Sequence, residues 1–273
     1  MVYGSTRTVD AEGDYVYSEI NSADWWWETQ DRLPPGATIV PLICGLDEIQ
    51  LVDFSGDKKT WPIYLIIANI HSSTRNKYSY LTLILLAFLP VPPKFQPNCT
   101  SDDRAQWDIN QQVPCDITKI VLEPVMRFPE GGDINSSTLW PCSDCKMCCC
   151  WPILASWLAD HMEHANLMGV KYNACPKCQI PKDELGSLIL PPHLESHRRK
   201  SAVFQQNHLE YQNAKTASDR QAIKITEDWF ESVSGRPVLC IFWIFRMSKP
   251  TTSTGLISCI MLLGFLVPII NIY

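Results

Sequence analysis

Three apolar runs between residues 38 and 95 constrain the fold more than any other feature of this sequence. They are TIVPLIC, the Ile- and Tyr-rich end of FSGDKKTWPIYLIIANI after a turn at Ser55–Lys58, and YLTLILLAFLPVPP. Short apolar runs separated by polar turn residues are typical of strands. The third run is too short to cross a bilayer and is closed by prolines, so we interpret it as a buried strand. Strands with short connections pair antiparallel, and the runs therefore predict a three-stranded antiparallel meander.

Polar segments on both sides of the meander are predicted to add helices. DWWWETQ (24–30) fits a short amphipathic helix within a polar arm, and residues 201–231 are also expected to be helical. Residues 96–114 are expected to be a polar linker, followed by a short helix. Asp116 would cap that helix, Ile117, Ile120 and Val121 would lie on one side, and Pro124 would kink or end it. The expected fold class is therefore α/β.

The segment WPILASWLADHMEHANLMG (151–169) has two interpretations. As a helix it has Pro152 in the first turn, an apolar stripe and Gly169 just past the end. Its first half fits a buried strand ending at Asp160 equally well, and periodicity alone does not separate the two.

Charge and cysteine content limit the classes of function. The 273-residue chain has a net charge of −6, so DNA contact would need a local basic patch such as Arg198–Lys200. Twelve cysteines occur without an apolar signal peptide at the N-terminus. This combination predicts a reducing compartment, where thiols bind metal or lie in the core.

The strongest chemical signal is a zinc-type pattern, C-x2-C-x14-H-x3-H, formed by Cys175, Cys178, His193 and His197. Two thiolates on a tight turn and two imidazoles one helical turn apart suit tetrahedral zinc. Two prolines precede His193, so the site could use one histidine, with His197 the better candidate.

Other arrangements of the cysteines remain open. Cys142 and Cys145 could join Cys175 and Cys178 in a four-thiolate zinc site. Cys148–Cys150 are expected to be core thiols, the ordinary role of a buried free cysteine.

Three aspartates are candidates for metal-assisted phosphodiester chemistry, which uses two or three converging carboxylates. Asp47 comes just after the first apolar strand, and Asp144 and Asp160 each lie at or near the end of an apolar run. A turn aspartate and a solvated helix edge are the ordinary explanations. No third acid is evident in the sequence.

The last segment, GLISCIMLLGFLVPIINIY (255–273), has no charge and follows Arg246 and Lys249. Such a flank is typical of a C-terminal membrane anchor with a cytoplasmic body. At 19 residues, with Pro268 inside, the segment is at the lower limit for spanning.

Five segments, in this order, resemble the Plavaka transposases, which are CACTA-like DNA transposases common in fungal genomes. The resemblance runs from about residue 14 to about residue 243 and is carried by the segments at 14–30, 45–70, 86–95, 151–171 and 174–187.

The resemblance implies an RNase-H-like catalytic core that cuts and rejoins DNA at element ends with Mg²⁺. It places the first acid at Asp47 in LDEIQL and the second at Asp160, or at Asp144. It also matches Cys175 and Cys178 with a following histidine to a C-x2-C…H element of the family. The family's third acid, and the segments expected after GRPVLCIFW, do not occur here. We therefore expect no strand transfer from this chain alone, and interpret the tail as a truncated or shifted reading frame.

The resulting domain prediction has four parts: an N-terminal arm (1–37), a partial RNase-H-like core (38–170), a zinc-binding element with a helical segment (171–245) and an apolar tail (246–273). The predicted function is that of a transposase-derived nuclear protein that binds DNA and whose ancestral reaction, two-metal DNA cleavage and strand transfer, is expected to be inactive in this fragment. Zinc is expected as a structural ion, Mg²⁺ as the ancestral catalytic ion, and a homo-oligomer is possible. One alternative is a zinc-containing DNA-binding module without catalysis. Another is a membrane protein anchored by residues 255–273.

Overall fold

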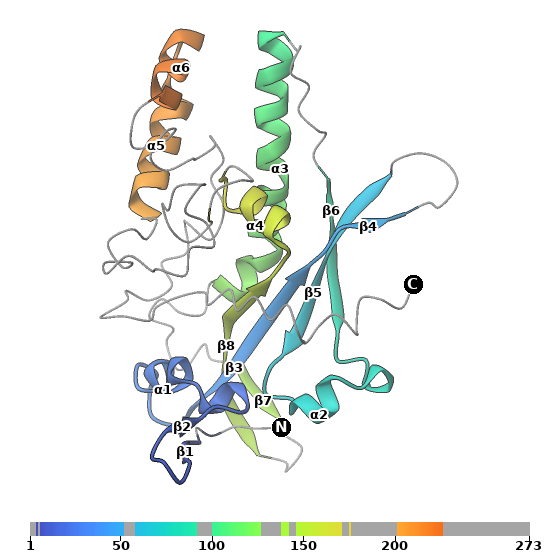
Figure 1. Ribbon diagram of the computed structural model, residues 1–273, viewed down its shortest axis with the longest axis vertical. Coiled ribbons are helices and arrows are strands. Elements are labelled where there is room, and N and C mark those ends of the chain that lie inside the picture. Colours follow the sequence, from blue (N-terminus) through green and yellow to red (C-terminus); the bar gives the residue numbers. More distant parts are fainter. Residues whose placement is uncertain are drawn as a thin grey trace.

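A mixed sheet is the central element of the computed structural model, which describes residues 4, 6–51, 58–91, 100–126, 138–141, 146–170, 175 and 201–225 (Figure 1). Its strands are β3 (Ala37–Leu46), β4 (Ile49–Gln50), β5 (Lys59–Ile67), β6 (Ile84–Pro90), β7 (Thr138–Pro141) and β8 (Met147–Leu158). The order is β4-β5-β3-β8-β7, and β6 also pairs with β5. The predicted α/β class is confirmed.

The antiparallel meander is confirmed in β3, β5 and β6. Leu42 to Leu46 of β3 pair with Ile67 to Ile63 of β5, and Thr60 to Leu65 of β5 pair with Pro90 to Ile84 of β6. The predicted burial of the third strand is wrong. In β6 only Leu89 is buried, because this strand lies at the edge of the sheet and its uniform apolar sequence faces solvent on most of its length.

Residues 151–158 form part of a strand and not the first half of a helix. β8 runs parallel to β3, from Ala37 paired with Cys149 to Gly45 paired with Leu158. A central strand buried on both faces reads as a continuous apolar run, which is why its sequence also fitted a helix. The helix over 151–169 is therefore corrected to β8 followed by α4 (His161–Leu167), and Gly169 lies after the end of α4 with a φ of 64°.

The linker expected at 96–114 is largely helix. α3 spans Ser101–Met126, so Asp116 is an interior residue and not a cap. The helix begins at a capping box: Asp103 N–H donates to Thr100 Oγ1 at 3.2 Å, and the Asp103 carboxylate accepts from Thr100 N–H at 3.0 Å. Ile117 and Val121 pack against the main core as predicted, but Ile120 is 67% exposed, and the buried residue of this stretch is Leu122.

Helices α3 and α4 pack against the sheet in the main core. This cluster joins Cys115 and Leu122 of α3, and Leu167 of α4, to strand residues that include Trp61 and Trp157. The polar segment after residue 200 is helical as predicted, in α5 (Ser201–Asn213) and α6 (Ala217–Ile225). Within the described ranges no helix is long and apolar enough to cross a membrane, and residues 255–273 lie outside them.

The N-terminal arm packs onto the sheet. It contains a small β1 (Thr8–Val9) and β2 (Tyr15–Val16) hairpin, a 3-10 turn η1 (Ile20–Ser22) and α1 (Asp24–Gln30), which confirms the short helix predicted there. Trp26 of α1 is fully buried. Gln30 Nε2 donates to the Ala37 carbonyl at 2.9 Å, which ties the end of α1 to the start of β3.

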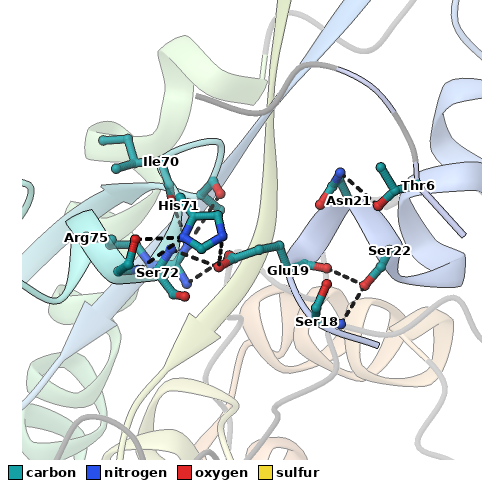
Figure 2. Close-up of polar contacts among 11 residues, drawn as sticks. Thr6, Ser18, Glu19, Asn21, Ser22, Ile70, His71, Ser72 and Arg75 are labelled. Atoms are coloured by element: carbon teal, nitrogen blue, oxygen red, sulfur yellow. Dashed lines mark hydrogen bonds and ion pairs between the residues drawn. The ribbon is translucent and has the colours of Figure 1, made fainter. Parts of the chain in front are cut away.

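Glu19 ties this arm to the connection between β5 and β6, which contains α2 (Ser72–Arg75) and the 3-10 turn η2 (Tyr78–Tyr80). Figure 2 shows the Glu19 carboxylate pointing at the start of α2. It accepts from Ser72 N–H at 2.9 Å, and Arg75 Nη2 and His71 Nε2 lie 3.8 and 3.5 Å from its oxygens. One nearly buried carboxylate therefore joins two segments that are far apart in the sequence.

Candidate functional site

Asp47 and Asp160 lie at the carboxyl ends of neighbouring parallel strands. Gly45 of β3 is the register partner of Leu158 of β8, and each aspartate follows its partnered residue by two positions. Because parallel strands end at the same edge of a sheet, the two carboxylates lie together. The structure thus brings together the first predicted acid and one of the two candidates for the second.

The second aspartate is also the N-cap of α4. Asp160 has extended backbone angles, and its carboxylate accepts from Glu163 N–H at 2.8 Å. Capping satisfies a free N–H of the first helical turn and holds the carboxylate at the positive end of the helix. The strand end and the helix start therefore fix the position of Asp160.

The two carboxylates have opposite pKa shifts. Partial burial raises the pKa of Asp47, and the negative charges of Asp160 and Glu48 raise it further, against a backbone hydrogen bond from Glu48. Burial also opposes ionisation of Asp160, but hydrogen bonds from Glu163, from Met162 N–H and the nearby His161 outweigh it and lower its pKa. Asp160 is therefore the readily ionised member of the pair.

A third acidic side chain, Glu163, adjoins this pair and was missed by the sequence analysis. It is 5% exposed, and burial, a side-chain hydrogen bond to Asp160 and the charges of Asp160, Asp47 and Glu48 raise its pKa to about 8. Its Oε2 is buried without a hydrogen-bond partner. The spacing Asp160-x2-Glu163 is a helix-start signal that could have drawn attention to it.

A basic side chain lies beside this acidic group. Glu48, the residue after Asp47, forms an ion pair with Lys59 at the start of β5. Both side chains are about one-third exposed. The Glu48–Lys59 ion pair therefore places the positive charge of Lys59 near the acidic end of the sheet.

The donor chemistry of Asp47 and Asp160 fits Mg²⁺. Across the part of the chain that the structure describes, no group of three or more His, Cys, Asp or Glu side chains is arranged to hold a metal ion. Mg²⁺ usually keeps several waters and is bound through one or two carboxylates plus substrate phosphates. Two neighbouring carboxylates whose charges repel each other meet that requirement.

The zinc pattern stays a prediction. Cys175 is half-buried, and Cys178, His193 and His197 lie outside the described residues, as do Asp144, Cys142 and Cys145. The core-thiol interpretation of Cys150 is confirmed by its burial in β8, whereas Cys148 and Cys149 are half-buried. Elemental analysis of the purified chain would test the zinc prediction directly.

Comparison with known proteins identifies the family. No curated protein matches the chain. The Plavaka transposase family matches residues 1–242, which include every element described above. The chain therefore belongs to the Plavaka transposase family.

Proposed function

We propose that this transposase-derived chain binds DNA and that Asp47 and Asp160 hold a divalent cation at the carboxyl ends of β3 and β8. The order of elements supports an RNase-H-like core: three antiparallel strands, then α3 and, after the short β7, a strand parallel to the first. The proposed reaction class is metal-assisted cleavage of a phosphodiester bond, and the proposed compartment is the nucleus, where the substrate is.

One observation carries this proposal. Both aspartates stand two positions beyond the Gly45–Leu158 pair. Two carboxylates brought together at one sheet edge from residues 113 positions apart can share an ion, whereas isolated turn aspartates cannot.

The chain's own residues supply orientation and charge. The cap geometry fixes the Asp160 carboxylate, the strand end fixes that of Asp47, and Lys59 offers a positive charge near the pair. A Mg²⁺ ion bound there would polarise the phosphate and lower the pKa of an attacking water.

The first experiment measures metal binding without relying on activity. Thermal unfolding of the purified chain is followed in EDTA and in increasing Mn²⁺ or Mg²⁺. The expected result is a melting temperature that rises with metal, as required when an ion binds only the folded state. Asp47→Asn and Asp160→Asn should each remove that rise, whereas Asp116→Asn, an exposed carboxylate on α3, should retain it.

A second experiment measures DNA cleavage. Supercoiled DNA is incubated with the chain and Mn²⁺, and Asp47→Ala is the matched inactive variant. Nicking that depends on metal and on Asp47 would support the cleavage proposal. A melting temperature of the unmodified chain that does not change with added metal would refute the shared cation site.

A further inference from the structure

The edge strand β6 and the residues before it present an unusual amount of apolar surface. Their exposed fractions lie between 39% and 77%. The exposed side chains are Tyr80, Leu81, Leu83, Ile84, Leu85, Leu86 and Phe88. Scattered exposed leucines are ordinary, but apolar side chains concentrated along one strand and the residues before it indicate an interaction surface.

This edge lacks most of the features that keep edge strands from pairing. Residues 78–93 contain no charged side chain, and no described strand pairs with the side of β6 that faces away from β5 (Figure 1). Edge strands are commonly protected by lysines, prolines or inward charges. Here the protection is confined to Pro90 at the end of the strand and to a register shift opposite Ile63 and Tyr64. The outer side of β6 therefore offers unpaired backbone groups flanked by apolar side chains.

We propose that β6 is a self-association surface, at which a second copy of this chain adds its own β6 antiparallel to extend the sheet. The absence of charge makes the strand a poor contact for DNA phosphates, which are bound by lysine and arginine. An antiparallel pair of identical strands is self-complementary about a two-fold axis and closes at two copies.

The exposed apolar area on and before β6 is close to the area that a dimer interface buries on each partner. The seven side chains expose on the order of 600 Å² in total, taking roughly 150–200 Å² for each fully accessible one. A standard interface buries about 800 Å² per partner, so complete burial of these seven side chains would supply most of that area, and strand pairing would bury the part of it that faces the partner. The partner's β6 would run in the opposite direction, so the Asp47–Asp160 pairs would lie at opposite ends of one continuous sheet.

Sedimentation velocity of the full chain over a wide range of concentration tests this inference. The unmodified chain should show a concentration-dependent dimer. Leu86→Lys with Phe88→Lys places like charges across the two-fold axis and should weaken the dimer by roughly tenfold or more. Leu139→Lys is the matched control, because Leu139 is 56% exposed on β7 at the other edge of the sheet.

Hydrogen exchange provides a test that needs no variant. The outer amides of residues 84–89 should exchange more slowly at high protein concentration than at low concentration. A chain that is monomeric throughout, or a dimer that the β6 variant and the Leu139→Lys control affect equally, would overturn the proposal. Exchange in β6 that does not depend on concentration would overturn it as well.

Discussion

Replacing Glu163 by glutamine should stabilise the folded chain, and the gain should grow with pH. The glutamate is 5% exposed beside Asp160 and Asp47, and its pKa is raised from 4.5 to about 8. An unfolded chain releases this proton near pH 4.5, whereas the folded chain holds it until about pH 8. Since the folded state binds the extra proton between these values, its free energy of unfolding falls as pH rises through that window.

The size of the effect follows from the width of the window. Each pH unit is worth about 1.4 kcal/mol for one group, so the penalty reaches on the order of 3 kcal/mol at pH 7. It is absent below pH 4.5 and complete above about pH 8. Glutamine has no proton to lose, and its amide can still donate to Asp160. The variant should therefore match the parent in mild acid and exceed it at neutral pH.

Urea denaturation in EDTA buffers from pH 5 to pH 8, followed by tryptophan fluorescence, measures the difference. Glu12→Gln, which removes an exposed carboxylate between β1 and β2, is the control for the loss of a surface charge. A stability difference between Glu163→Gln and the parent that is equal at pH 5 and pH 8 would refute the assignment of a buried, protonated carboxyl. A variant less stable than the parent at pH 8 would refute it too.

Two further predictions concern the packing of the fold. Burial opposes ionisation of Glu19, but the hydrogen bonds from Ser72 and the nearby Arg75 and His71 outweigh it and lower its pKa, so its stabilising effect is present above the ordinary carboxyl pKa and is lost as pH falls. Glu19→Gln should cost about 1–2 kcal/mol at pH 7 and less in acid, and an equal urea-denaturation loss at both pH values would contradict this. Leu122→Ala should cost roughly 2–5 kcal/mol because it leaves a cavity under the sheet. Ile120→Ala, on the exposed side of α3, should cost little, and similar losses for both would contradict the orientation of the helix.

The meander could be predicted because its signals are local, whereas β8 could not be decided from sequence. Turn residues and apolar runs mark β3, β5 and β6 within one short stretch. β8 owes its conformation to pairing with β3, over 100 residues earlier in the chain. Tertiary pairing of this kind overrides local propensity. The sequence of an apolar run does not indicate which distant strand it will pair with. The exposure of β6 was missed for the same reason, since an apolar run does not reveal whether it is central or at the edge.

The start of α3 shows a signal that was present and not used. Thr100-x2-Asp103 is a capping box, which predicts a helix start, whereas the polar residues after it are typical of a linker. The candidate site, too, could be predicted only in part from the sequence. Asp47 and Asp160 could be proposed from their positions after apolar runs, but the burial of Glu163 depends on how α4 packs against the sheet.

The acidic group at the end of β3 and β8 has two physical explanations that make opposite predictions. In a purely structural cluster, the burial of Asp47 and the repulsion from Asp160 and Glu48, which together raise its pKa, are an unrelieved cost. Asp47→Asn would then stabilise the chain equally with and without divalent metal. In a cation site the bound ion relieves that repulsion, so the same variant would be more stable in EDTA but lose its response to Mn²⁺. If Asp47→Asn is more stable than the parent in EDTA but no longer responds to Mn²⁺, the acidic group is a cation-binding site and not a purely structural cluster. This comparison needs no measurement of DNA cleavage.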